Sequence, residues 1–171
     1  RRPVKFPVHD KNLGCELAGN ELAGELSAGN YLNSAFGKPG DRIWVRETWA
    51  DAGASAPDLK LYRANYPEHV PSIYEDVPPA KEIRWTPSIH MPRTASRILL
   101  EITGVRIERL QSITLGDICK EVGCGLYDFR PATHGFQVWE ELWKSIYGAE
   151  SWNANPWVWV IEFKRVEGGA A

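Results

Sequence analysis

The chain has 171 residues, of which 43% are hydrophobic and 25% charged, with a formal net charge of −2. This is the composition of one compact globular domain with a core of its own. The near-neutral balance excludes a nonspecific nucleic-acid coat, and the absence of a long apolar run or secretory signal excludes a membrane partner.

The charges are unevenly distributed along the chain. Residues 83–110 carry five Arg against two Glu and no Lys, and residues 1–12 carry four basic residues against one Asp. The stretches between and after them are acidic, with net charges of −5 over 13–82 and −3 over 111–171. Arg favours planar, bidentate contacts to phosphate or carboxylate. Two interpretations of the Arg-rich segment stay open: a ligand-binding face, or an exposed strand face with internal salt bridges.

Cysteine usage indicates a reducing compartment. Cys15, Cys119 and Cys124 are an odd number without a CxxC motif, as expected of reduced thiols in a cytoplasmic protein. A zinc site from Cys119, Cys124 and His134 lacks a fourth ligand, so buried thiols are the preferred interpretation. The nucleotide-loop, metalloprotease and serine-hydrolase motifs are also missing, and neither a metal nor a cofactor is expected.

The first half of the chain reads as turns and short strands. Residues 13–30 repeat Ala-Gly at five-residue spacing, and their Gly content predicts a surface loop or a frayed helical turn rather than a packed helix. Strands are predicted over 42–49, after a Lys-Pro-Gly-Asp turn, and over 59–65. Residues 66–92 contain six Pro, which predicts a long loop that is functional or mobile.

A long apolar strand is predicted over 97–110, with Gly104 marking a bulge or bend. Thr114 followed by Asp117 resembles a capping box and predicts a short helix that ends at Gly123.

A second helix is predicted over 134–147, where one apolar stripe is formed by Phe136, Trp139, Trp143 and Ile146. Residues 157–166 alternate as a strand with a strongly aromatic face. Because strands outnumber helices and the helices come late, we expect an α+β domain built on a small, mostly antiparallel β-barrel with flanking helices.

Two kinds of candidate site residue stand out. The segment 88–97 combines Arg93 and Arg97 with His90, Thr94 and Ser96. Guanidinium forks beside hydroxyl donors suit an anionic, hydrogen-bonding ligand such as a nucleotide.

The second kind is a carboxylate in an unusual setting. Glu47 shares a predicted strand face with two aliphatic residues, the alternative being that it lies in solvent at the strand's end. Glu121 lies near a helix C-terminus, where an acid is electrostatically disfavoured. That placement hints at an acid or base, and the alternative is a solvated surface Glu.

Several ordered strings together resemble a known family. They are GDRIWVRETWA, YRA, SIHMPRTASRILLEITGVRIERLQSI, a W-x-x-L-W helix and NPWVWVIEFKRV, which span residues 37–166. The chain resembles phage and prophage proteins of the ASCH family, whose domains are PUA-like β-barrels grouped with modules that bind RNA or modified bases.

The resemblance also implies parts of a site. The family pattern includes an upstream strand and helix ending in a G-R-K-T-x-T-R-R type motif, of which Arg1 and Arg2 look like the last two residues. In family members that cleave N4-acetylcytidine, a Lys and a Thr of that motif act with a later Glu, which Glu121 matches. The Lys and Thr have no counterpart within residues 1–171. Relatives carry Trp where this chain has Thr94, so we expect weaker base stacking there.

A PUA-like barrel would place its ligand in a cleft between barrel strands and flanking helices. The Pro-rich loop, Trp85 and the segment 88–97 would form one wall. The groups expected to hold phosphate or a base edge are Arg1, Arg2, Arg93 and Arg97. Glu121 and Glu47 would supply carboxylates.

Three functions follow as hypotheses. The first is a binding module for RNA or a modified nucleotide or nucleoside, acting in the cytoplasm of a bacterial host during phage infection. The second is a hydrolase of the same fold, either an N4-acetylcytidine-type amidohydrolase or a ribonuclease. The third is a non-catalytic phage protein that binds other protein. The sequence predicts no oligomeric state.

Overall fold

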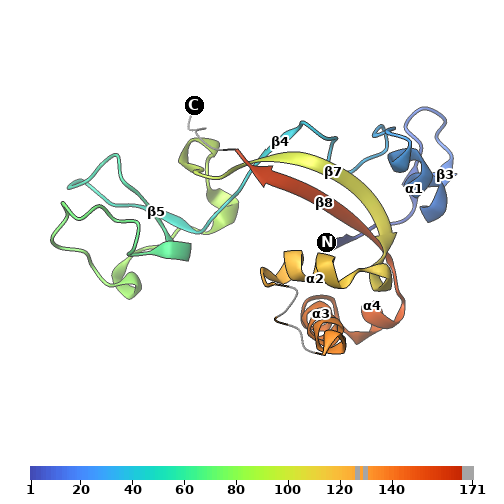
Figure 1. Ribbon diagram of the computed structural model, residues 1–171. Coiled ribbons are helices and arrows are strands. Elements are labelled where there is room, and N and C mark those ends of the chain that lie inside the picture. The colour runs from blue at the N-terminus through green and yellow to red at the C-terminus, as the bar shows by residue number, and fades with distance from the viewer. Residues whose placement is uncertain (126–127, 129–130, 167–171) are drawn as a thin grey trace. The chain divides into compact units, whose positions relative to one another are not determined.

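A computed structural model describes residues 1–125, 128 and 131–166 of the chain. These residues form two compact units: unit 1 contains 1–39 and 103–162, and unit 2 contains 40–102 and the residues from Phe163 onward. The two longest strands, β7 (Leu99–Arg109) and β8 (Trp157–Arg165), contribute residues to both units (Figure 1). The prediction of a single domain stays a prediction.

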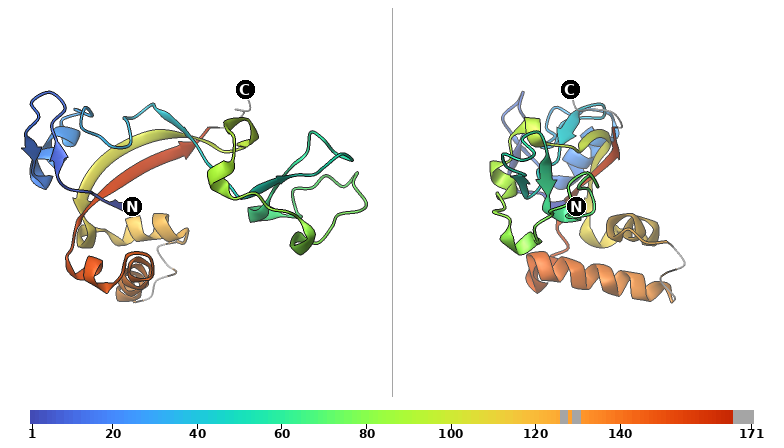
Figure 2. Two further views of the ribbon diagram at one scale, coloured as in Figure 1. Left: turned by 180° about the vertical axis from the view of Figure 1, so that it is seen from behind. Right: turned by 90° about the vertical axis from the view of Figure 1, so that its left-hand side faces the viewer.

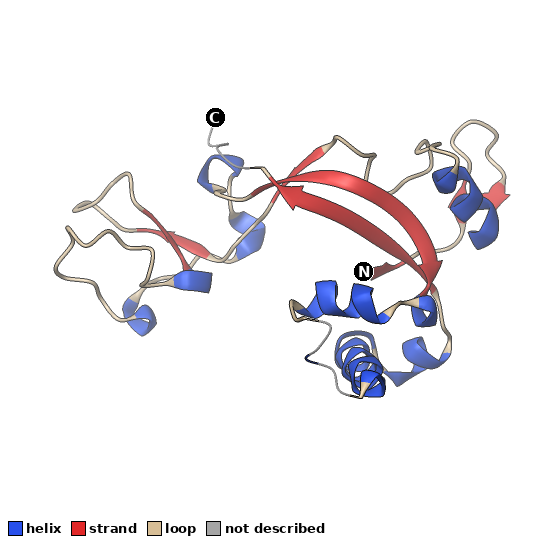
Figure 3. Cartoon of the chain, in the orientation of Figure 1, coloured by secondary structure: helices blue, strands red, loops and turns tan. Residues whose placement is uncertain are grey.

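The strands belong to one four-stranded sheet and two hairpins. The sheet has the order β1–β8–β7–β4, with β1 (Arg2–Pro3) pairing antiparallel with β8. In unit 1 a short hairpin joins β2 (Val8–His9) to β3 (Glu16–Leu17). The expected mixture of helices with an antiparallel sheet is therefore present, as the colouring in Figure 3 shows.

The first helix after the long strand has the predicted caps. Helix α2 (Leu115–Val122) begins after Thr114, whose hydroxyl accepts a hydrogen bond from the Asp117 backbone N–H at 3.2 Å. It ends at Gly123, which has the left-handed φ of 73° that Gly adopts without a steric cost. The sequence prediction for this helix is confirmed.

Two further helices complete unit 1, α3 (Ala132–Tyr147) and α4 (Ala149–Asn153). Of the predicted apolar stripe on α3, Trp139 and Trp143 are buried, with ring centroids 6.0 Å apart, whereas Phe136 and Ile146 are exposed. The buried residues around this pair are Leu110, Ile113, Ile118, Cys119, Val158 and Val160. This cluster therefore covers the face of β8 that carries Val158 and Val160.

The prediction of a loop or frayed turn within residues 13–30 is wrong for its middle part. Residues 19–27 form helix α1 (Gly19–Ser27), in which Leu22 and Leu26 are buried. These side chains are four residues apart, so they lie on one face, and their burial outweighs the low helix propensity of the two glycines. The Glu21 carboxylate also accepts a hydrogen bond from the Ala18 N–H, at 2.8 Å, at the start of the helix.

Gly19 allows α1 to pack closely against the start of β8. The backbone of this residue lies against the indole of Trp157, and a Cβ here would overlap the ring. Gly104, expected to mark a bulge, lies within β7, where a Cβ would come 3.1 Å from a carboxylate oxygen of Glu162.

In unit 2 the strands are shorter than the sequence predicts. The segment 42–49 forms β4 (Arg42–Trp44) and only the first residue of β5 (Trp49–Asp51), and β6 (Lys60–Tyr62) covers part of 59–65. Strand β5 pairs antiparallel with β6, and β4 with β7.

The remaining regular structure of unit 2 consists of 3₁₀ turns, at Arg63–Asn65, Ala80–Glu82, Ser88–His90 and Arg93–Ala95. As predicted from its six Pro, the span 66–92 has little regular structure. The regular structure described there consists of the turns at Ala80–Glu82 and Ser88–His90 and a bridge between Trp49 and Thr86. Within the described residues, no helix has the length and apolarity needed to span a membrane.

The close approach at Gly19 predicts an unusual sensitivity to one methyl group. We expect Gly19→Ala to lower the free energy of unfolding by about 1–3 kcal/mol, because α1 or Trp157 must shift to admit the Cβ. Urea unfolding measures this difference.

Gly24→Ala in the same helix is the matched control. A Cβ at Gly24 meets no atom within 4 Å, so this change should be neutral or stabilise the protein by up to about 1 kcal/mol. Equal effects of the two substitutions would contradict the packing described for Gly19.

Candidate functional site

Arg97 attaches the segment 88–97 to the rest of unit 2. Its guanidinium donates two hydrogen bonds to the Glu47 carboxylate, at 2.9 and 2.8 Å, and its Cζ lies 4.1 Å from the centroid of the Tyr62 ring. The Glu47 side chain is only 10% exposed and that of Arg97 27%. The hydrogen bond to Glu47 raises the pKa of Arg97 further above its ordinary value, so this guanidinium stays charged.

The alternative that Glu47 lies in solvent is wrong. Strand β4 ends at Trp44, so Glu47 lies in the connection to β5 and is bound to Arg97. Its backbone N–H also faces the sulfur of Met91, at 3.1 Å.

Tyr62 and Ser96 complete the attachment of this segment. The Tyr62 hydroxyl donates to the Ala95 carbonyl at 2.8 Å, and burial raises the pKa of this phenol. The Ser96 hydroxyl donates to the Val45 carbonyl at 2.9 Å. Ser96 and Arg97, both predicted to contact a ligand, therefore hold the segment in place through bonds within the protein. Below we call Glu47, Tyr62, Ser96 and Arg97 the anchor.

Three of the predicted ligand-binding residues remain exposed. His90 ends one 3₁₀ turn, and Arg93 and Thr94 begin the next. Within the part of the chain that the structure describes, none of these side chains has an ion-pair or hydrogen-bond partner. They present an imidazole, a guanidinium and a hydroxyl to solvent on a segment that the anchor holds.

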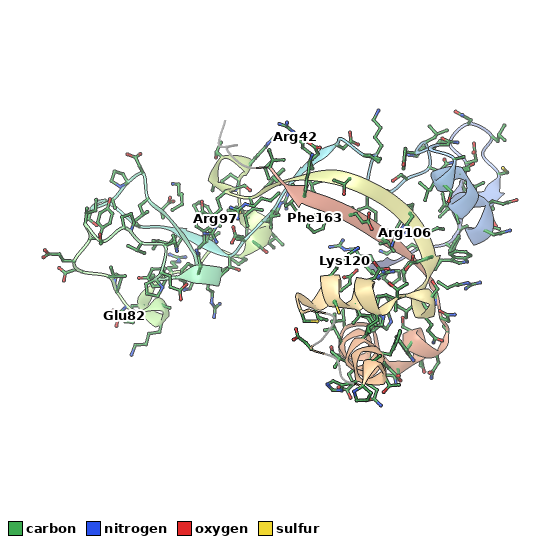
Figure 4. All side chains as sticks on the ribbon, viewed as in Figure 1. Arg42, Glu82, Arg97, Arg106, Lys120 and Phe163 are labelled. Atoms are coloured by element: carbon green, nitrogen blue, oxygen red, sulfur yellow. The ribbon has the colours of Figure 1, made fainter. Side chains whose placement is uncertain are left out.

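The structure places Arg46, together with Trp44, beside the segment 88–97. The Arg46 Cζ lies 4.9 Å from the centroid of the Trp44 ring, and its guanidinium donates to the Ile89 carbonyl at 3.3 Å. Sequence reasoning missed this pair, although alternation within 42–49 puts both side chains on one strand face. We refer to Arg46, His90, Arg93 and Thr94 as the basic face. Figure 4 labels Arg97, which belongs to the same segment, 88–97, as His90, Arg93 and Thr94.

Trp85 has a different setting within unit 2. Its indole N–H donates to the Ala80 carbonyl at 2.9 Å, and its ring meets the Tyr66 ring edge-on at 5.5 Å. These contacts hold the Pro-rich loop together and use the polar edge of the indole.

In unit 1 the structure brings Arg1 and Glu121 together. The Arg1 side chain is 1% exposed and forms ion pairs with Glu108, with Asp117 at 3.4 Å and with Glu121 at 3.1 Å. Arg2, in β1, is exposed.

This unit 1 cluster extends further along β7, β8 and α2. Arg106 lies 3.2 Å from Glu108 and 2.9 Å from Glu162, and Lys120 lies 3.6 Å from Asp117 (Figure 4 labels Arg106 and Lys120). Burial raises the pKa of Asp117, but the Thr114 hydroxyl and the neighbouring cations outweigh it and hold that pKa below its ordinary value. With three cations and four carboxylates, the cluster carries a net charge of −1 and offers an anionic ligand no electrostatic gain.

The ten predicted site residues thus divide between the units. Unit 1 holds Arg1, Arg2 and Glu121, and unit 2 holds the other seven. In the first set Arg1 and Glu121 are paired with each other, whereas the second set includes exposed basic side chains.

Within the described residues, neither the cysteine thiols nor the other metal-binding residue types form a further candidate site. Burial and a hydrogen bond with Cys119 raise the pKa of Cys124, so this thiol is held protonated. Among residues 1–125, 128 and 131–166, no three His, Cys, Asp or Glu side chains are grouped so as to hold a metal ion.

Comparison of the chain with protein-family models, with curated proteins and with solved structures finds no match in any of the three.

The anchor geometry predicts a large coupling energy between Glu47 and Arg97. In a double-mutant cycle with alanine at each position, we expect a coupling of about 1–3 kcal/mol in the free energy of unfolding, because the pair is bidentate and shielded from solvent.

The exposed pair of Asp51 and Lys60, also in unit 2, is the control. Their side chains are 56% and 35% exposed, so the same cycle should give a coupling of about 0.5 kcal/mol or less. Couplings of equal size for the two pairs would show that Glu47 and Arg97 do not form a special attachment.

Proposed function

We propose that this protein is an ASCH-type, PUA-like module that binds RNA or a modified nucleotide through the basic face of unit 2. The observation that supports the proposal most is that, within the described residues, His90, Arg93 and Thr94 are exposed without a partner, on a segment that Ser96 and Arg97 bind to the rest of unit 2. Exposed guanidinium groups bind phosphate oxygens, and each phosphate that they neutralise releases counterions.

The basic face has the chemistry for a single-stranded ligand. Arg46 and Arg93 suit phosphate oxygens, and His90 and Thr94 add donors that reach a base edge or a ribose hydroxyl. The Arg46 guanidinium lies over the Trp44 ring, so a base could stack on that guanidinium plane even though this chain has Thr94 where relatives carry Trp. On this proposal the protein acts in the cytoplasm of a bacterial host during phage infection.

A titration with a short single-stranded RNA tests the binding proposal. We expect Arg46→Ala/Arg93→Ala to weaken binding about tenfold at low salt, and to make the dependence of log K on log[salt] shallower by about 0.7 per lost phosphate contact. Fluorescence anisotropy at two salt concentrations measures both quantities.

Arg63→Ala/Lys81→Ala removes the same charge from exposed positions elsewhere in unit 2 and should leave affinity within about twofold. Equal losses in the two double variants, or no binding at low salt, would refute a specific basic face.

A second candidate is a hydrolase, favoured by the contact between Arg1 and Glu121. The resemblance implies a Lys and a Thr just before Arg1, whose guanidinium pairs with the Glu121 carboxylate at 3.1 Å. On this scheme the Lys would take the Thr proton and the Thr oxygen would attack the amide carbonyl. The C–N bond would break as Glu121 carries a proton to the leaving nitrogen, and water would then hydrolyse the acyl-Thr ester to release acetate.

This candidate predicts that protein from the full reading frame cleaves N4-acetylcytidine and that Glu121→Gln lowers kcat about 10²–10⁴-fold. Release of acetate measures turnover. Lys120→Gln, on the same helix, should retain most of the activity. Equal turnover by wild type and Glu121→Gln would remove Glu121 from the mechanism.

A further inference from the structure

Unit 2 contains a pocket that none of the predicted site residues lines. Its cavity volume is about 590 Å³, within the range of roughly 300–1,000 Å³ that is typical of small-molecule sites. Its walls come from the connection between β5 and β6 and from residues 66–78 of the Pro-rich loop. Figure 2 shows the β5–β6 hairpin and this loop from two further directions.

The hairpin side of the pocket is apolar and well packed. Ala56 and Leu61 line it and are buried, and Leu59 is half-buried. Backbone hydrogen bonds close the connection, from Ala52 N–H to the Leu59 carbonyl and from Leu59 N–H to the Ala56 carbonyl, at 3.1 and 3.0 Å. This wall is therefore formed before any ligand arrives.

The loop side is held by the aromatic residue Tyr66. Its hydroxyl donates to the Pro78 carbonyl, and its ring packs edge-on against His69 at 6.3 Å as well as against Trp85. Burial raises the pKa of Tyr66, so the hydroxyl stays protonated and able to donate. A second tyrosine, Tyr74, also lines the pocket.

The only charged side chains among the lining residues are acidic. Glu75 and Asp76 are both exposed at the pocket, and within the described residues neither has an ion-pair partner. Asp51 on the neighbouring hairpin is instead neutralised by Lys60. The pocket thus carries two uncompensated negative charges beside an apolar cavity with two tyrosines.

We propose that this pocket binds a small organic cation, an amine head group on an apolar or aromatic body. The apolar walls and the tyrosine rings receive the body, and the ring faces also attract positive charge. The amine pairs with the exposed carboxylates of Glu75 and Asp76 at the pocket. Phosphate is repelled by the same carboxylates, so the pocket selects the opposite charge to the basic face and does not depend on RNA binding there.

A set of three phenyl compounds of similar size tests this. 2-Phenylethylamine, neutral 2-phenylethanol and anionic phenylacetate are titrated separately into ¹⁵N-labelled full-length chain, and amide shifts are followed. We expect the amine to bind with a Kd of about 1–10 mM and to move amides within 52–61 and 66–78. The alcohol should bind several-fold more weakly, and phenylacetate should show no saturation.

The charge dependence is tested with Glu75→Gln/Asp76→Asn, which keeps the shape of both exposed side chains. We expect this variant to bind the amine about fivefold to tenfold more weakly. Glu68→Gln/Glu82→Gln neutralises two acids of the same loop that do not line the pocket, and should change the Kd less than twofold (Figure 4 labels Glu82).

Four results would overturn the proposal: no saturable shift with the amine, shifts confined to residues outside the pocket, equal affinity for amine and phenylacetate, or unchanged affinity in Glu75→Gln/Asp76→Asn. Because no RNA is present, none of them depends on whether the basic face binds nucleic acid.

Discussion

The bidentate ion pair between Glu47 and Arg97, stacked over Tyr62, is the interaction on which the candidate interface depends. It joins three segments of unit 2 that are far apart in sequence: the connection after β4, strand β6 and the residues just before β7. The segment 88–97, made of two 3₁₀ turns with Pro92 between them, has little regular hydrogen bonding of its own. Side-chain hydrogen bonds therefore hold this segment where a strand would be held by backbone hydrogen bonds, and they fix where its exposed donors lie.

The Arg residues of this protein are of two kinds, those bound to carboxylates and those exposed to solvent. Arg1 and Arg97 are shielded and bound to carboxylates, so their charge stabilises the protein's own contacts. Arg93 is exposed and has no partner in the part of the chain that the structure describes, and the Arg46 guanidinium lies over an indole. A ligand gains most from the second kind, because binding it breaks no existing ion pair. In unit 2 this separates the basic face from the acidic pocket of the Pro-rich loop.

Local chemistry explains which parts could be predicted from the sequence. Helix α2 was predictable because Thr114 and Gly123 determine its two ends by short-range hydrogen bonding and backbone conformation. Helix α1 was not, since its stability comes from burial of Leu22 and from close packing of Gly19, which are tertiary effects. The Arg-rich segment was found by composition alone. Its division into bound and free side chains depends on Glu47, some fifty residues away along the chain, and no local pattern reports such a pairing.

Mapping a short single-stranded RNA onto the protein by amide chemical shifts tests the central claim most directly. The account predicts that saturable shifts concentrate at residues 44–46 and 88–94, that they weaken with added salt, and that the anchor residues keep their free-state contacts. Shifts concentrated around Arg1 and Glu121, with residues 88–94 unaffected, would contradict it. That result would move the ligand site to unit 1.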